Sequence, residues 1–129
     1  MDKNKDLPTA GEVSGILLAY IGDAQLELEV RKALVLRGGR LGELNKAADA
    51  LVSAEGQCKA LTKLEPVFTE DEAAAFRRGK NAHVNSVPKH CTPLTYRKAT
   101  GLEAVFGYLT LKNDAVRIAE LVRIGFFEE

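Results

Sequence analysis

Asp23 lies in the middle of an apolar stretch, directly after a glycine. In the segment AYIGDAQLE (residues 19–27), an apolar run over residues 16–21 precedes the Gly22-Asp23 pair, and Leu26 and Leu28 follow it. Glycine costs a helix interior about 1 kcal/mol relative to alanine, and aspartate is also unfavourable there. A break of this kind in a strong helical pattern is typical of a functional or strained site.

A second segment, ATGLEAVFGYL (residues 99–109), has a similar composition. Glu103 lies here among apolar residues, between Gly101 and Gly107. Because glycine lets another backbone approach a helix closely, we expect the two helices to cross and to bring Asp23 and Glu103 together. Two unpaired carboxylates about 4 Å apart repel by roughly 4 kcal/mol at an effective dielectric constant near 20. A shared proton, a basic partner or a divalent cation must offset this repulsion.

A divalent cation would give the two carboxylates a chemical role. Mg²⁺ prefers oxygen ligands, keeps several waters and needs only one or two protein carboxylates. Between Asp23 and Glu103 it could bind a phosphate oxygen and activate water for phosphodiester hydrolysis. Glu27, one helical turn after Asp23, could add an outer-shell oxygen. The alternative is a surface ion-pair ladder of Asp23, Glu27 and Arg31, worth a few tenths of a kcal/mol per pair, but a ladder does not require Gly22.

The periodicity of the apolar residues is helical throughout and predicts an all-α fold. We expect one domain over residues 1–129, with residues 1–13 as a polar tail. A capping box, TEDE at residues 69–72, starts a short helix that Gly79 is expected to end. Residues 80–92 are expected to form a polar loop. The other expected helices cover residues 14–36 (closed by Gly38-Gly39), 41–51, 53–64, 93–111 and 114–124 (with Gly125 as its stop).

The net charge is zero, but the charges are unevenly distributed. Residues 73–102 contain six Lys and Arg and no Asp or Glu, while the remaining twelve Lys and Arg face eighteen Asp and Glu, a net charge of −6. A basic segment on an acidic chain indicates a surface for a polyanion. A chance run of solvated side chains is the alternative. The basic residues are Arg77, Arg78, Lys80, Lys89, Arg97 and Lys98.

Other features indicate a protein of the reducing cytoplasm. The N-terminal segment MDKNKDLPTAGE is polar and acidic, unlike a signal or transit peptide, and no apolar stretch approaches the roughly 18 residues of a membrane span. Cys58 and Cys91 lack metal-type spacing, so we expect them to be buried small hydrophobic residues. His83 and His90 are expected to be solvated loop residues, because a metal site at His90-Cys91 has no supporting second pair.

Four segments in order resemble the ribonuclease III catalytic domain, and in particular its compact bacterial branch, Mini-ribonuclease III. The resemblance extends over residues 16–121 and implies a homodimer of helical domains that cuts double-stranded RNA with Mg²⁺, for which Mn²⁺ can substitute. On this resemblance, Asp23 and Glu103 match the catalytic, metal-binding carboxylates. The four segments are LAYIGDAQLE, LVSAEGQCKAL, FTEDEAAAFRRGKNA and YRKATGLEAVFGYL.

The resemblance also implies how RNA is held. Longer members carry a Glu and an Asp where this chain has Ala19 and Thr100, a departure typical of the Mini branch. Because the chain ends at Glu129, we expect no separate double-stranded-RNA-binding domain, so the catalytic domain itself must hold the substrate. RNA of the A form is recognised mainly through phosphates and 2′-hydroxyls. The implied RNA-contacting residues lie in RRGKNA, in the loop 80–92 and before Glu103: Arg77, Arg78, Lys80, Asn81, Arg97 and Lys98.

Mini-ribonuclease III enzymes trim the base-paired stem that brackets 23S ribosomal RNA, so the resemblance implies this substrate and large-subunit ribosomal proteins as further partners. Two other functions remain open. A catalytically silent module could bind RNA or ribosomes, although it has no reason to keep two repelling carboxylates. A Mg²⁺-dependent nucleotide pyrophosphohydrolase is also all-α, but such enzymes pair acids one helical turn apart on two helices, and the Glu103 helix has no second acid.

Overall fold

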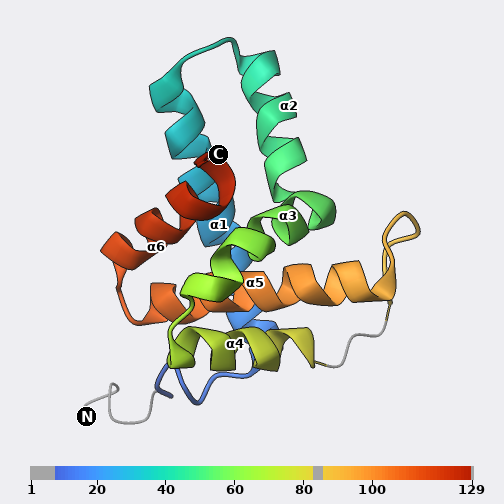
Figure 1. The fold of residues 1–129 in the computed structure, drawn as a ribbon, viewed down its shortest axis with the longest axis vertical. Coiled ribbons are helices and arrows are strands. Elements are labelled where there is room, and N and C mark those ends of the chain that lie inside the picture. Colours follow the sequence, from blue (N-terminus) through green and yellow to red (C-terminus); the bar gives the residue numbers. More distant parts are fainter. Residues whose placement is uncertain (1–7, 83–85, 129) are drawn as a thin grey trace, which may run out of the picture.

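Figure 1 shows the computed structural model, which describes residues 8–82 and 86–128. These residues form six α-helices and no strand, so the all-α prediction is confirmed. None of these helices combines the length and the apolar character that a membrane span requires. The helices are α1 (Gly15–Arg37), α2 (Leu41–Val52), α3 (Ala54–Leu64), α4 (Glu70–Lys80), α5 (Pro93–Leu111) and α6 (Ala115–Val122), with a 3₁₀ turn η2 (Glu65–Val67) and a π-helical turn η3 (Arg123–Phe127).

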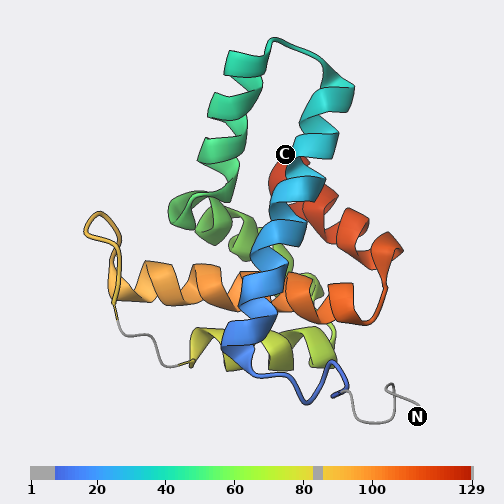
Figure 2. The same cartoon turned by 180° about the vertical axis from the view of Figure 1, so that it is seen from behind.

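Helix α5 is the centre of the fold. It packs against α1, α3, α4 and α6, and Figure 1 shows it running across the middle of the molecule with α4 alongside. Seen from behind, α1 passes over α5 (Figure 2). Leu102, Val105 and Phe106 of α5 are fully buried and form the core together with Leu26 of α1 and Leu61 of α3.

The crossing of α1 and α5 is a direct backbone contact. A Cβ atom on Gly22 would lie 1.7 Å from the carbonyl oxygen of Glu103, and one on Gly107 would lie 1.8 Å from the carbonyl oxygen of Leu18. Any larger residue at either position would overlap the other helix. The expected crossing of two glycine-marked helices is therefore confirmed, although Gly101 faces the Phe76 ring of α4 and not α1.

The helix termini follow the capping signals in the sequence. Ser14 caps α1 by accepting a hydrogen bond from the Leu17 amide. Thr69 and Glu72 form the predicted capping box of α4. Gly38 and Gly39 adopt φ values of 89° and 132°, a region that favours glycine, and so end α1 before α2 begins. Figure 1 shows this turn at the top of the molecule.

Two predicted helix ends are wrong, for the same reason. Helix α4 continues through Gly79 to Lys80, and Gly79 is buried against Ala104 of α5. Helix α6 ends at Val122, and the chain then passes through η3, in which Gly125 packs against Leu64. Both glycines permit close packing between elements. A glycine that ends a helix and one that packs inside it look alike in a sequence.

Candidate active site

The α1–α5 crossing brings Asp23 and Glu103 together, as the sequence predicts. Gly22 contacts the backbone of Glu103, so the next residue of α1 lies at the edge of the same contact. Asp23 is exposed, whereas Glu103 is half-buried. The neighbouring Asp23 carboxylate adds to the rise in the pKa of Glu103. The pair therefore has one carboxylate open to solvent and one directed into the protein.

Glu103 has a strongly altered acidity. Burial is the largest cause and raises the pKa of its carboxyl group to about 7, because the charged form loses hydration. A hydrogen bond from Gln57 opposes this effect, while the neighbouring carboxylates of Asp23 and Glu27 add to it. A carboxyl group whose pKa is strongly raised by burial and by a second carboxylate is a candidate for a functional site.

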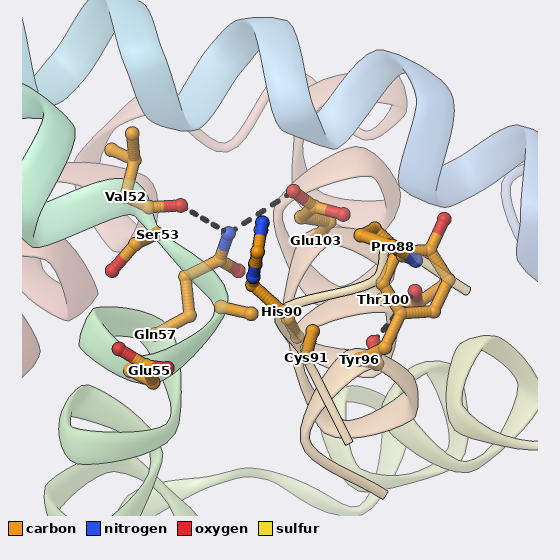
Figure 3. A pocket seen from close by; sticks show the side chains of 12 residues that line it. Val52, Ser53, Glu55, Gln57, Pro88, His90, Cys91, Tyr96, Thr100 and Glu103 are labelled. Carbon is orange, nitrogen blue, oxygen red and sulfur yellow. Dashed lines mark hydrogen bonds between the residues drawn. The ribbon is translucent and has the colours of Figure 1, made fainter. Parts of the chain in front are cut away.

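Gln57 is a site residue that the sequence analysis did not single out. Its side chain is only 2% exposed, and its Nε2 donates hydrogen bonds to Glu103 Oε2 at 3.1 Å and to the Val52 carbonyl oxygen at 3.0 Å. Figure 3 shows both bonds. The sequence does contain a signal for it: Gln57 lies on the apolar face of α3, between Ala54 and Leu61. A buried amide needs hydrogen-bond partners, so an amide at this position indicates a buried hydrogen bond.

A pocket of about 400 Å³ opens beside Glu103 and Gln57. Figure 3 shows the side chains of His90 and Tyr96 around it. His90 is exposed, as expected of a loop residue, but it also lines this pocket. The prediction for His83 lies outside the described residues.

The two cysteines differ from the prediction of full burial. Cys58 and Cys91 are half-buried and form no disulfide. Burial raises the pKa of the Cys58 thiol, and the charge of Lys98 opposes that rise. Cys91 lines the same pocket as Glu103.

The basic residues do not form one continuous group. Arg97 Nε donates to the Lys80 carbonyl oxygen at 3.0 Å, and an Arg97 terminal nitrogen donates to Asn81 Oδ1 at 3.3 Å. These contacts join the start of α5 to the end of α4. Arg78 points elsewhere, because its guanidinium donates to the carbonyl oxygens of Gly11 and Ala10 in the N-terminal turn. The Arg77 side chain is exposed.

Only part of the surface ladder on α1, the alternative to a metal site, is present. Arg31 and Glu27 form an exposed ion pair at 3.3 Å. Glu27 also contributes to the negative field around Glu103. It therefore lies near the site, and its ion pair with Arg31 is of the kind that adds little stability.

The donor set fits a hard divalent cation. Asp23 and Glu103 offer carboxylate oxygens, and a cation would neutralise the negative charges that, after burial, raise the pKa of Glu103. Within residues 8–82 and 86–128, no group of three Asp, Glu, His or Cys side chains could hold an ion. An ion with few protein ligands and several waters is typical of Mg²⁺. Asp23 and Glu103 are residues that could hold such an ion.

Comparisons with known proteins identify the family. Residues 17–114 match the ribonuclease III domain. A Mini-ribonuclease 3 from Synechocystis sp. is 40% identical over 119 residues, covering 92% of this chain and 82% of that protein. A Mini-ribonuclease 3 from Symbiobacterium thermophilum is 40% identical over 109 residues, covering 84% of each chain. The chain belongs to the ribonuclease III family, in its Mini-ribonuclease III branch.

The fold agrees with that assignment. The crystal structure of a Fusobacterium nucleatum protein superposes with a TM-score of 0.79 at 34% identity, over 88% of this chain and 91% of that one. As a member of the ribonuclease III family the chain is an endoribonuclease, and the family acts on RNA with divalent metal ions. Ala19 and Thr100 are both buried, and the Thr100 hydroxyl donates to the Tyr96 carbonyl oxygen at 2.9 Å.

Proposed function

We propose that this endoribonuclease cleaves double-stranded RNA with Mg²⁺ in the cytoplasm, and that its substrate is the base-paired stem bracketing 23S ribosomal RNA. The observation that supports this most strongly is the carboxylate pair at the α1–α5 crossing. Helix packing forces Asp23 and Glu103 together through Gly22, even though the two charges repel. A protein without use for a cation would gain stability by losing one of them.

In this proposal Asp23 and Glu103 are the catalytic, metal-binding residues. Asp23 is exposed and binds the ion on the side that faces the substrate, while the half-buried Glu103 binds the ion on the side that faces the protein core. Bound Mg²⁺, or Mn²⁺ in its place, would stabilise charge on the phosphate and make a water more acidic. The chain's own contribution is to fix both carboxylates on rigid helices, so that little reorganisation is needed when the substrate arrives.

RNA is held, in this proposal, by the basic segment around the end of α4 and the start of α5. Arg97 and Asn81 are joined there by a hydrogen bond, next to Lys80. Arg77 is exposed on α4. Phosphate contacts of this kind give affinity without sequence information. Arg78 is proposed to act by ordering the N-terminal turn that it contacts, and Lys98 on α5 completes the basic set.

We further propose that two copies pair, with both active sites on one face, and that large-subunit ribosomal proteins are further partners. Helix α1 buries Leu18 and Leu26 in the core but exposes other large apolar residues on its outer side. Exposed apolar residues grouped on one helix face mark a protein contact. Leu17, Tyr20 and Leu28 are among these exposed residues.

The decisive experiment uses a long synthetic RNA duplex and a single-stranded RNA of the same sequence. The wild-type protein should cut the duplex only when Mg²⁺ is present and should leave the single strand intact. Asp23→Asn and Glu103→Gln should abolish cleavage and keep duplex binding, because each substitution removes a metal ligand without changing the basic segment. Glu103→Gln also keeps an oxygen that can accept the hydrogen bond from Gln57.

Two results would contradict the proposal. Substantial cleavage by either variant would remove that residue from the catalytic role. Duplex binding by the wild-type protein without any cleavage would favour the silent RNA-binding module.

A further inference from the structure

Gln57 connects the α2–α3 corner to the active site. It lies on α3, and its amide nitrogen bridges the Val52 carbonyl oxygen at the end of α2 and the carboxylate of Glu103 on α5. The nitrogen has two hydrogens, and each is used by one of these bonds. Because the side chain is almost fully buried, water cannot readily replace either partner.

The chemistry of its neighbours determines which way the amide faces. The Val52 carbonyl can only accept a hydrogen bond, so the group that faces it must be the NH₂. The Oε1 atom of Gln57 then faces away from both bonds. This oxygen is buried and has no hydrogen-bond donor among the residues that the structure describes. A buried acceptor without a donor is costly in a native protein and calls for an explanation.

We propose that Gln57 is the positioning residue of Glu103 for metal binding. Its amide holds Oε2 of Glu103, which leaves the other carboxylate oxygen for the divalent ion. Gln57 lines the pocket beside Glu103, and its own Oε1, which has no donor among the described residues, is the acceptor for a water that arrives with the ion. This inference rests on the proposed function, because it assumes that Glu103 binds a metal ion.

The arrangement explains why a buried amide is present at this point of the core. An ion with few protein ligands depends on the orientation of each of them, and groups that hydrogen-bond a ligating side chain tune metal affinity by about 10- to 100-fold. A leucine or methionine at position 57 would fill the same space and leave Glu103 free to rotate. Asp23, which is exposed, has no comparable support among the hydrogen bonds of the described residues.

The test measures metal binding directly, with Mn²⁺ as the probe. The free-ion EPR signal of Mn²⁺ is titrated with RNA-free protein at mildly alkaline pH, for the wild type, Gln57→Met and Gln57→Asn. The matched control is Gln25→Met, because Gln25 also donates its amide to a carboxylate, that of Glu29 at 3.1 Å on α1. The rise in unfolding temperature caused by Mn²⁺ is recorded for each protein, which separates metal binding from any loss of stability.

We expect Gln57→Met to weaken Mn²⁺ binding by about tenfold or more and to reduce the metal-induced rise in unfolding temperature. Gln57→Asn, which keeps a shorter amide, should lie between Gln57→Met and the wild type, and Gln25→Met should bind as the wild type does. In single-turnover cleavage, Gln57→Met should lower the rate constant and leave the duplex affinity unchanged.

Unchanged Mn²⁺ affinity in both Gln57 variants would overturn this inference and leave the proposed function intact. A wild-type protein that binds no divalent ion would overturn both. A purely structural role would lower the unfolding temperature of Gln57→Met while its affinity for Mn²⁺ stayed that of the wild type, and this result would also reject the inference.

Discussion

Glu103 is the residue whose chemistry depends most on its surroundings. In the unfolded chain it is an ordinary carboxyl group, whereas in the fold burial and the charge of Asp23 raise its pKa to about 7. Gln57 reduces this effect with one hydrogen bond. The side chains of Asp23, Gln57 and Glu103 therefore determine both the charge of the site and its ability to bind a cation.

The raised pKa predicts a pH-dependent stability of the metal-free protein. Between pH 4.5 and about 7 the folded protein keeps a proton on Glu103 that the unfolded chain loses, so the free energy of unfolding should fall as the pH rises through this window. The stabilisation that Glu103 contributes is fully present below pH 4.5. The pKa difference corresponds to a decrease of up to about 3 kcal/mol in the free energy of unfolding. Urea unfolding in EDTA across this range measures it.

Glu103→Gln is the control for that prediction, because it has no group to titrate at this position. Its free energy of unfolding should vary less with pH than that of the wild type, and at neutral pH it should equal or exceed the wild-type value. Parallel curves for the two proteins would mean that Glu103 ionises normally in the fold. Other titrating groups are present in both proteins and cancel in the comparison.

At the scale of the elements, the contact between α1 and α5 carries the site. Gly22→Ala places a methyl group where the Glu103 carbonyl oxygen lies, so the helices must separate. We expect a loss of about 3 kcal/mol or more in the free energy of unfolding, at the upper end of what overpacking costs, together with loss of cleavage. Thermal or urea unfolding measures the stability.

Gly42→Ala is the matched control for the crossing. Gly42 is a helical glycine of α2 with no atom near its would-be Cβ, so alanine should stabilise the protein by about 0.5–1 kcal/mol. If Gly22→Ala were as stable as Gly42→Ala, the two helices would not be in backbone contact.

The junction of α4 and α5 leads to a prediction about RNA binding. Each phosphate contact releases condensed counterions, so log affinity should fall against log salt concentration with a slope of roughly −0.7 to −0.9 per phosphate. Arg77→Ala or Arg97→Ala should flatten this slope by about one unit without moving the cut site. The measurement is duplex binding by the Glu103→Gln protein across a salt series.

Two further variants sharpen the RNA-binding test. Lys63→Ala, on α3, should leave the slope unchanged. Arg78→Ala should lower stability through loss of its contacts with the N-terminal turn. A slope near zero, or one unaffected by alanine at Arg77 and Arg97, would show that RNA is held elsewhere.

At the scale of the whole molecule, the outer face of α1 predicts a dimer. Tyr20 is 81% exposed and Leu17 is 58% exposed on the helix that carries Asp23. Light scattering should give twice the monomer mass for the wild type. Tyr20→Lys should shift the protein towards monomer, because burying a lysine in the interface is unfavourable.

Val116→Lys is the control for the dimer prediction. Val116 is as exposed as Tyr20 but lies on α6, so this variant should remain dimeric. A wild-type protein that is monomeric at micromolar concentration and fully active would contradict the proposed pairing.

The sequence by itself determined the helices, their caps and the two acids. Helical periodicity and the capping residues depend on near neighbours in the chain, so Ser14, Thr69 and the all-α class could be predicted. The glycines beside Asp23 and Glu103 indicated a crossing, because a glycine destabilises a helix interior and close packing against another helix can offset that loss.

Only the tertiary structure decided what each remaining residue touches. Gly79 and Gly125 pack against distant helices although their local sequence suggested helix ends. Arg78 contacts the N-terminal turn, and Gln57 holds Glu103 from 46 residues away in the chain. Partners of this kind are brought together by the packing of whole helices, so a buried hydrogen bond or a raised pKa cannot be read from spacing along the chain. The two acids could be identified from the sequence, but the raised pKa of Glu103 arises from the fold.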